Sequence, residues 1–366
     1  MNKFTLLLSL QLNTTVMTYI FRYSLPAIIA IALLAGCSKS ESQTIVAVGY
    51  DDVDQVLNDS VPAFGGKCYV VIHEDGKAVY SKGYGGYTGS TRQLIASCSK
   101  WLSAAVLMSL VDEGKIKLSD SVGKYLPVFT ANQKGNITIA QLFSHTSGFP
   151  GNSTQGYESN VLSTLQLAAD GIAKNVPLLN APGTTFYYGG VSMQVAGRIC
   201  EVASGKDWKT LAAEKIFTPC GMVNTDFGLT ANPQIGGGAR STPDDYIRFL
   251  DMLMNKGVAA NGTRVLSEAA VNAMEESQTA HATIAYTPYP AAWLGTKDFY
   301  AIGNWRDVTG PGGELIENSS PGAFGSHPWI NRGKKRTGFI FTFIADNGYL
   351  TTIATSLKIR ALVRNK

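Results

Sequence analysis

Hydrophobic and polar residues alternate twice near the start of the chain and then recur at helical spacing. Residues 68–73 and 78–83 show the two-residue period of β-strands. Asp75 and Gly76 between them suit a tight hairpin turn, because both residue types tolerate a positive φ. Upstream, hydrophobic side chains fall on one side of a short helix over residues 51–60. The pattern predicts a helix followed by a β-hairpin.

A longer helix is expected over residues 97–113, where hydrophobic side chains recur at steps of three and four until Gly114 ends the pattern. The middle of the chain is mainly helical, and one helix there opens on a capping box formed by Thr138 and Gln141. The helices predicted in this part, including the one with the capping box, cover residues 138–144, 191–203, 207–216 and 246–255, the last after a cap at Thr242. A final helix is predicted from about residue 350.

Strand-like sequence returns late, over residues 299–305, 322–324 and 337–345. Strands at both ends with helices between them predict an α+β fold. In that fold, an antiparallel sheet is flanked by helices and is interrupted by a helical lobe over roughly residues 115–290. The whole globular domain is expected over residues 49–366.

The composition of the chain mainly excludes classes of protein. With 45% hydrophobic and 16% charged residues among 366, the chain is too apolar to be disordered. A length above about 300 residues favours one large domain with two lobes, or two domains. The net charge of +4 forms no concentrated basic face, so no nucleic-acid partner is expected. Neither C-x-x-C nor H-E-x-x-H spacing occurs, so we expect no metal and no cofactor.

The first 36 residues have the layout of a secretory signal peptide. They contain Lys3 and Arg22, no acidic side chain, and an apolar run of 12 residues before Cys37. That run is shorter than the roughly 20 residues that a membrane-spanning helix needs. Residues 34–37 resemble the bacterial lipobox, which implies cleavage before Cys37 and attachment of a lipid to it.

A start at Met17 gives a better-proportioned signal peptide than the first methionine. Residues 37–48 are expected to form a flexible tether between the lipid on Cys37 and the domain. The lipid would anchor the domain at the bacterial cell envelope, in the periplasm or on the outer surface. In that oxidising compartment Cys200 and Cys220 are the preferred disulfide pair, and two buried free thiols are the open alternative.

Ser97 and Lys100 stand three residues apart at the start of the long predicted helix, so their side chains face the same side. A serine hydroxyl becomes a nucleophile when a neighbouring base takes its proton, and a lysine with a lowered pKa can be that base. The helix N-terminus favours a developing oxyanion. S-x-x-K occurs often by chance, so its interpretation depends on further motifs.

Such motifs follow in order along the chain. They are QLFSHTSGFP at residues 141–150, PGTTFYY at 182–188, GGARSTPDD at 237–245 and PGAFG at 321–325. Together with Ser97 and Lys100, they make the chain similar to the serine β-lactamase and penicillin-binding-protein family, specifically its class C, DD-peptidase and family VIII carboxylesterase branch. The resemblance covers about residues 50–360 and implies the β-lactamase/DD-peptidase fold.

The resemblance also implies site residues. It carries Ser97 over as the acyl-accepting nucleophile, Lys100 as its base or proton shuttle, and Tyr188 as a partner in the general-base role. A phenol serves as a base only if Lys100 and the helix dipole stabilise its phenolate. The oxyanion hole would use the backbone N–H groups of Ser97 and Ala323, the residue after the third-motif glycine, Gly322, on an edge strand.

Two positions depart from the family pattern. Gly190 stands where the family usually has asparagine, so that position has no side-chain amide to hold a substrate carbonyl. Ser320 stands where the third motif has lysine or histidine, which removes a cation for a substrate carboxylate. Both departures favour esters or non-standard amides over penicillin-like substrates. Tyr157, Trp293 and Trp305 are either walls of a hydrophobic acyl pocket or core and surface aromatics.

Other reactive residue types have structural interpretations. His145 is expected to make a structural hydrogen bond, because no G-x-S-x-G motif supports a Ser-His-Asp triad. Cys98 is expected to be a small buried hydrophobe, and the basic residues 332–336 a solvated hairpin tip. His327 is either at the border of the cleft or structural.

The sequence thus predicts a serine hydrolase that acts on small-molecule esters or non-standard amides at the cell envelope. A β-lactamase or a D-amino-acid/DD-peptidase of the same fold is the first alternative. The alternative of another class is a catalytically silent envelope lipoprotein used for binding, against which the intact Ser97, Lys100 and Tyr188 argue.

Overall fold

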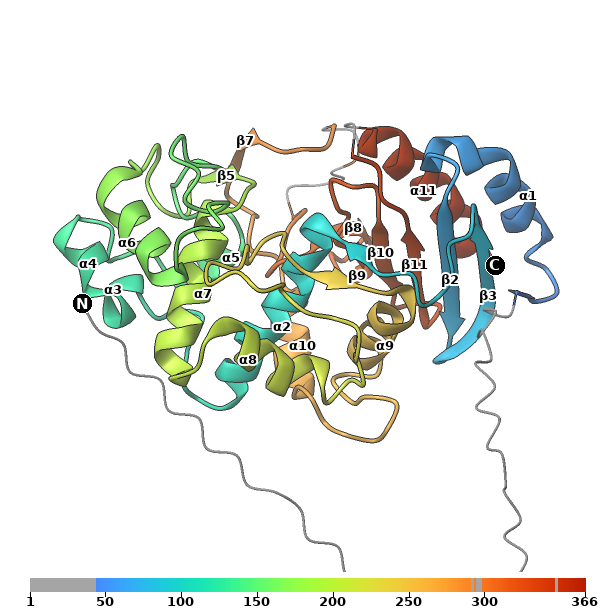
Figure 1. The fold of residues 1–366 in the computed structure, drawn as a ribbon, viewed down its shortest axis with the longest axis horizontal. Coiled ribbons are helices and arrows are strands. Elements are labelled where there is room, and N and C mark those ends of the chain that lie inside the picture. Colours follow the sequence, from blue (N-terminus) through green and yellow to red (C-terminus); the bar gives the residue numbers. More distant parts are fainter. Residues whose placement is uncertain (1–43, 291–292, 294–297, 346–347) are drawn as a thin grey trace, which may run out of the picture. The chain divides into compact units, whose positions relative to one another are not determined.

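A seven-stranded antiparallel sheet is built from strands at both ends of the chain (Figure 1). The computed structural model describes residues 44–290, 293, 298–345 and 348–366. The strand order is β1-β3-β2-β11-β10-β9-β8. These strands are β1 (Ile45–Val46), β2 (Cys68–Glu74), β3 (Lys77–Tyr84), β8 (Trp305–Thr309), β9 (Leu315–Ser319), β10 (His327–Asn331) and β11 (Arg336–Phe341).

Most of the helices and two small sheets lie between β3 and β8 along the chain, whereas the first of the described helices precedes β2 and the last follows β11. The described helices are α1 (Asp51–Ser60), α2 (Ser99–Asp112), α3 (Val122–Tyr125), α4 (Pro127–Ala131), α5 (Ile139–Phe143), α6 (Leu165–Asn175), α7 (Val191–Ser204), α8 (Trp208–Ala212), α9 (Pro243–Met254), α10 (Glu268–Glu275) and α11 (Tyr349–Arg364). Two further strand pairs join β4 (Gln93–Leu94) to β6 (Arg240–Ser241), and β5 (Thr185–Tyr187) to β7 (Thr283–Tyr286). The predicted α+β class with an antiparallel sheet is confirmed.

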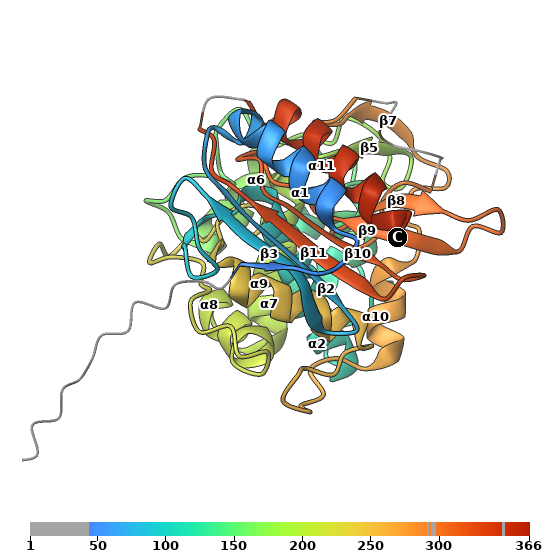
Figure 2. The same ribbon diagram turned by 90° about the vertical axis from the view of Figure 1, so that its right-hand side faces the viewer.

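Alternation along β2 explains why the sheet is covered on both faces. Cys68, Val70 and Ile72 share a core cluster with residues of α1 and α11, and these two helices lie side by side across one face (Figure 2). Tyr69 and Val71 point the other way and belong to the larger cluster around α2. The predicted hairpin between β2 and β3 is confirmed.

Helix α2 is buried on all sides, with every residue from Ser99 to Leu110 inside the protein. A helix with no solvent face lies in the interior of a domain. Its polar side chains form hydrogen bonds inside the protein. For example, Ser103 Oγ donates to the Ile235 carbonyl at 2.7 Å. Lys100 is buried with the rest, which matters for its chemistry.

Local capping signals are confirmed where they were predicted. Thr138 Oγ1 accepts from the Gln141 N–H while the Gln141 side chain accepts from the Thr138 N–H, closing the capping box of α5. At α9, the side chain of Thr242 accepts a bond from the N–H of Asp245.

Three predictions about the ends of elements are wrong. Residues 299–305 form no continuous strand, because only Tyr300 and Trp305 bridge and β8 begins at Trp305. Residues 322–324 form a tight turn after β9, in which the Gly322 N–H donates to the Ser326 carbonyl at 2.8 Å. Residues 45–46 fall in the predicted tether but pair with β3 as β1.

Of the two alternatives for Cys200 and Cys220, the structure has buried free thiols, and Cys68 and Cys98 are free and buried as well. The predicted signal peptide and Cys37 lie outside the described residues. Among the helices within the described ranges, none is long and apolar enough to cross a membrane.

Candidate active site

Ser97 and Lys100 are in direct contact. Ser97 lies in a short 3-10 turn, Ala96–Cys98, immediately before α2, and Lys100 lies in the first turn of that helix. Lys100 Nζ is 3.1 Å from Ser97 Oγ, as the spacing of three residues predicts. Ser97 is half-buried at the wall of a cavity, so its hydroxyl is open to a substrate.

The turn that carries Ser97 is strained and is held from several sides. Ala96 has a φ of 44°, a left-handed conformation that costs a residue with a side chain roughly 1–3 kcal/mol. Ser99 Oγ donates to the Ala96 carbonyl at 2.6 Å and accepts from the Ala239 N–H at 3.0 Å. The hydroxyl of Tyr246 donates to the Cys98 carbonyl at 2.7 Å. These bonds fix the position of the nucleophile.

The surroundings of Lys100 lower its pKa. Its side chain is only 3% exposed, and burial lowers its pKa to about 7. Nζ donates to the carbonyl of Gly236 at 2.7 Å, which leaves it directed at Ser97. A Cβ at residue 236 would lie 3.2 Å from Nζ, so a glycine gives the lysine room there.

Tyr188 follows β5 and lies beside the lysine, with Lys100 Nζ 4.6 Å from its ring centroid. Burial raises the pKa of the Tyr188 phenol, although the Ser97 hydroxyl acts in the opposite direction. The expected condition for a phenolate base is therefore not met in the free protein. Among the described residues the Tyr188 hydroxyl makes no hydrogen bond of ordinary geometry.

The third motif reaches the nucleophile through Ser320 and Gly322. Ser320 Oγ donates to the backbone carbonyl of Ser97 at 3.0 Å. A Cβ at residue 322 would lie 2.4 Å from the carbonyl oxygen of Ile95, so only glycine fits this approach. Ala323 lines the same cavity as Ser97, but it does so from the turn after β9 rather than from an edge strand.

A cavity of about 490 Å³ joins these residues. Ser97, Lys100, Tyr188 and Ala323 all line it, so the structure brings together the predicted nucleophile, base, tyrosine and second oxyanion donor. Gly190 lines it as well. The cavity volume fits a small molecule.

Several lining residues of this cavity were missed from the sequence, and two of them, Asn152 and Glu158, lie next to Gly190. Asn152 accepts a bond from the Gly190 N–H through Oδ1 at 3.2 Å. Glu158 fills the space beside Gly190, where an added Cβ would lie 2.9 Å from Glu158 Cγ. Gly190, which stands where the family usually has asparagine, indicates that another side chain fills the space beside residue 190. It does not indicate which side chain that is.

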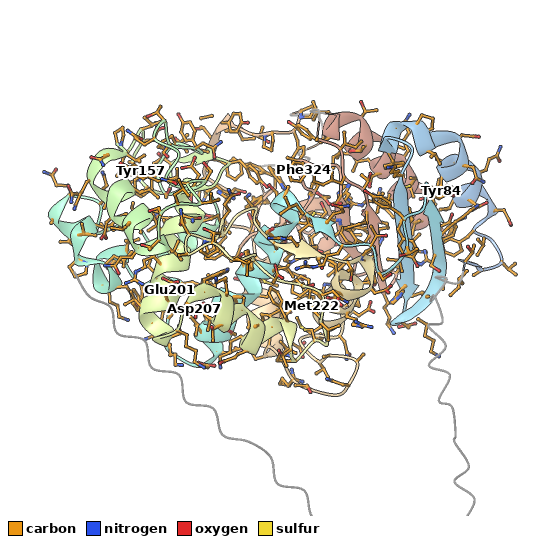
Figure 3. The ribbon with its side chains drawn as sticks, viewed as in Figure 1. Tyr84, Tyr157, Glu201, Asp207, Met222 and Phe324 are labelled. Atoms are coloured by element: carbon orange, nitrogen blue, oxygen red, sulfur yellow. The ribbon has the colours of Figure 1, made fainter. Side chains whose placement is uncertain are left out.

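The aromatic candidates for an acyl pocket pack elsewhere. Trp305 stacks on Tyr188 with 5.2 Å between ring centroids, and it supports that ring without lining the cavity. Tyr157 packs against Gly171 of α6 and accepts a bond from Asn175 (Figure 3). Trp293 packs on Tyr289, which does line the cavity, at 6.2 Å. Tyr157 is a packing residue, whereas Trp293 and Trp305 also line a small hollow of about 30 Å³ next to Tyr289.

The two candidate histidines are structural. His145 is buried against Tyr188, and its Nε2 lies 3.3 Å from the Tyr300 hydroxyl, so its predicted structural hydrogen bond is confirmed. His327 is buried in β10 with Nε2 3.0 Å from Arg360, and it does not line the cavity of Ser97. Burial lowers the pKa of both imidazoles well below the usual range.

Cys98 is fully buried beside the nucleophile, as predicted, with Sγ 3.5 Å from the Ser326 carbonyl. Burial raises its pKa, so the thiol is protonated and unreactive at neutral pH.

The basic segment 332–336 is not a fully solvated tip. Arg332 donates to the carbonyl of Leu253 and pairs with Glu275, and Arg336 is buried against Glu74. Only residues 333–335 are exposed. The prediction is wrong at both ends because each guanidinium meets a carboxylate far away in the sequence.

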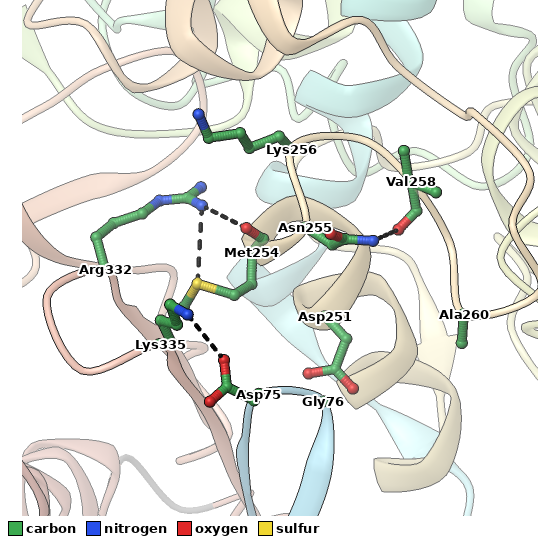
Figure 4. A pocket seen from close by; sticks show the side chains of 10 residues that line it. All are labelled: Asp75, Gly76, Asp251, Met254, Asn255, Lys256, Val258, Ala260, Arg332 and Lys335. Atoms are coloured by element: carbon green, nitrogen blue, oxygen red, sulfur yellow. Dashed lines mark hydrogen bonds and ion pairs between the residues drawn. The ribbon is translucent and has the colours of Figure 1, made fainter.

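This segment lines a second cavity, of about 620 Å³, between the turn of the β2–β3 hairpin and the C-terminal end of α9 (Figure 4). Its cations are already paired, for example Lys335 with Asp75 at 3.4 Å. The second cavity shares no lining residue with the cavity of Ser97, so it takes no part in the chemistry of the nucleophile.

Comparison with known proteins agrees with this geometry. The family model described as Beta-lactamase matches residues 67–348. Penicillin-binding protein 4 of Amycolatopsis lactamdurans is 27% identical over 323 residues, which cover 78% of this chain and 80% of that protein. A candidate β-lactamase from Bacteroides dorei has a TM-score of 0.77 and 31% identity, covering 86% of this chain and 99% of the other.

A family VIII carboxylesterase shares the fold, with a TM-score of 0.66 and 18% identity over 87% of this chain and 99% of the other. The matched region includes the Ser97–Lys100 contact, Tyr188 and the turn at Ala323. The resemblance found in the motifs is confirmed, and the chain belongs to the β-lactamase family of serine hydrolases.

Proposed function

We propose that the protein hydrolyses small carboxylic esters through an acyl-enzyme on Ser97. The observation that carries this proposal is the 3.1 Å contact between Ser97 Oγ and a buried Lys100 whose pKa is about 7. A lysine that is neutral at physiological pH can take the serine proton, which an ordinary lysine cannot.

In the proposed reaction, Lys100 accepts the Ser97 proton as Oγ bonds to the ester carbonyl carbon. The resulting oxyanion is stabilised by the backbone N–H groups of Ser97 and Ala323, each worth roughly 3 kcal/mol. The bond to the alcohol oxygen then breaks, and the alcohol leaves with a proton that Lys100 returns through Tyr188. Water then attacks the acyl carbonyl carbon as Lys100 takes its proton. The bond from that carbon to Ser97 Oγ breaks, Lys100 returns the proton to Oγ, and the acid leaves.

Two features support esters over penicillin-like amides. Ser320 offers a hydroxyl that is already bonded to Ser97, and no cation from the third motif faces a substrate carboxylate. Gly190 has no side chain to hold an amide carbonyl. The shared fold with a family VIII carboxylesterase agrees with this preference.

A fluorophosphonate probe tests the nucleophile. Wild type should be labelled and Ser97→Ala should not be labelled. Equal labelling of both proteins would overturn the assignment of Ser97, and absence of labelling in wild type would favour the catalytically silent binding protein.

Substrate class is tested by comparing p-nitrophenyl butanoate with nitrocefin and with a peptide that ends in D-Ala-D-Ala. The ester should be hydrolysed with the highest kcat/KM. Faster turnover of nitrocefin or of the peptide would replace the proposed esterase by a β-lactamase or a DD-peptidase.

We further propose that Cys37 carries a lipid that holds the domain at the cell envelope, a proposal supported by the lipobox-like residues 34–37. Expressed in bacteria, the wild-type chain should partition into detergent, and Cys37→Ala should remain in the aqueous phase. The same partition for both proteins would contradict the anchor.

A further inference from the structure

Glu158 is the one acidic residue among the described residues that line the cavity of Ser97. Lys100 is the one basic residue among these described lining residues. The others are serine, threonine, asparagine, glutamine, glycine, proline, alanine or tyrosine. Lys100 Nζ is bonded to Ser97 and to the Gly236 carbonyl, so it is committed to the reaction. The carboxylate of Glu158 therefore sets the electrostatic character of the cavity.

Glu158 is held in a defined orientation. Its Oε1 accepts from the Ser153 N–H at 3.0 Å, and its Oε2 accepts from Ser153 Oγ at 2.5 Å. Ser153 Oγ in turn accepts from the Tyr157 N–H at 3.0 Å. Each carboxylate oxygen has a further lone pair, so both can accept another bond from a ligand.

Glu158 has no cationic partner among the described residues. Within the described ranges, no lysine, arginine or histidine forms an ion pair with Glu158, whereas the half-buried Glu201 pairs with Arg198 at 2.9 Å. The negative charge of Glu158 is therefore available to pair with the cationic group of a ligand.

Glu158 lies beside Gly190 on the wall of the cavity. Gly190 lacks a side chain, and the Glu158 stem fills that space, at 2.9 Å from where a Cβ would lie. Gly190 is two residues beyond Tyr188, and both line the cavity with Ser97. The carboxylate thus lies on the wall that adjoins the catalytic tyrosine.

We propose that Glu158 binds an ammonium group of the substrate, so that the enzyme prefers esters that carry a primary amine over neutral and anionic esters. This inference rests on the proposed esterase function. An ammonium donates charge-assisted hydrogen bonds to the open lone pairs of the carboxylate, whereas a substrate carboxylate at this wall is repelled.

The test uses two p-nitrophenyl esters of the same shape, those of β-alanine and of butanoic acid, in which an ammonium replaces a methyl group. At neutral pH, wild type should hydrolyse the β-alanine ester with a kcat/KM about tenfold higher, on the order of one charge-assisted bond. Glu158→Gln should lose this preference, so that the ratio of its kcat/KM values for the two esters falls to about one.

Glu276→Gln is the matched control, because it makes the same charge change at an exposed residue outside the cavity and should keep the preference. Fluorophosphonate labelling of Glu158→Gln confirms that its site is folded. Equal losses on both esters in that variant, or no preference in wild type, would overturn the inference. If wild type is neither labelled nor active on either ester, it is the proposed function that fails.

Discussion

The hydroxyl of Ser320 donates a 3.0 Å hydrogen bond to the backbone carbonyl of Ser97. This bond ties the end of β9 to the turn that holds the nucleophile. The residue that stands in place of a family cation therefore has a positioning role in this chain. It links the sheet to the strained turn at Ala96, whose left-handed φ depends on such support.

Ser320→Ala should lower kcat/KM for p-nitrophenyl butanoate about fivefold, because one hydrogen bond of roughly 1 kcal/mol is lost from the support of Ser97. Steady-state kinetics checks this value. Ser320→Thr keeps the hydroxyl and should restore most of the rate. A threonine variant as slow as the alanine variant would show that the hydroxyl is not the relevant group.

The kcat/KM for a neutral ester should rise with pH through a midpoint near 7. Burial lowers the pKa of Lys100 to about 7, and only the neutral amine can accept the Ser97 proton. Initial rates with p-nitrophenyl butanoate between about pH 5.5 and 8.5 give this profile. A rate that does not change across this range would exclude Lys100 as the titrating base.

The same shift makes folding depend on pH. The pKa of Lys100 is about 7 in the folded chain against an ordinary value of 10.5, so between these values the unfolded chain binds more protons and stability rises with pH. Lys100→Met removes this linkage. From pH 6 to pH 9, the free energy of unfolding of wild type should therefore rise by about 3 kcal/mol relative to the variant. Urea unfolding at both pH values measures this difference, and a constant difference would contradict the lowered pKa.

Gly322→Ala should reduce kcat at least about a hundredfold, because a Cβ 2.4 Å from the Ile95 carbonyl must displace the turn that precedes Ser97. Circular dichroism would verify that the variant is folded. Gly333→Ala is the control, since an added Cβ there meets only Asn331 Oδ1 at 3.7 Å. Equal activity of the two variants would show that the close approach has no catalytic consequence.

Arg360→Met should lower the free energy of unfolding by about 3–5 kcal/mol, because it leaves Asp307 without its cation and the buried Glu317 with Arg364 alone. Arg360 is fully buried and donates to Asp307 at 2.8 Å and to Glu317 at 3.0 Å. Arg364 also pairs with Glu317 but is 34% exposed, so Arg364→Met should cost less. Urea midpoints that fall equally in both variants would contradict this difference.

The parts of the fold and the site that were predicted depend on residues close together in the sequence. The Asp75-Gly76 turn has φ values of 48° and 73°, as a hairpin turn requires. The Thr138–Gln141 capping box and the Ser97–Lys100 contact each span three residues along the chain. In these cases backbone geometry fixes the contact before any tertiary structure forms.

The parts that were not predicted join distant segments. Glu158 enters the cavity from a loop some thirty residues before Gly190, and no local pattern specifies its path. Arg336 is buried because its partner, Glu74, lies on the neighbouring strand, 262 residues earlier. The raised pKa of Tyr188 likewise follows from burial among rings that the fold supplies.

The pairing of β2 with β11 sets the order in which this protein can be made. Tyr69 pairs with Phe341, so the centre of the sheet stays open until nearly the whole chain has left the ribosome. Ser97 is synthesised more than two hundred residues before Ala323. During that interval β2 has an unpaired edge and the nucleophile has no second oxyanion donor. A chain truncated before β11 would contain Ala323 but would leave this edge of β2 unpaired, so it would be prone to edge-to-edge aggregation.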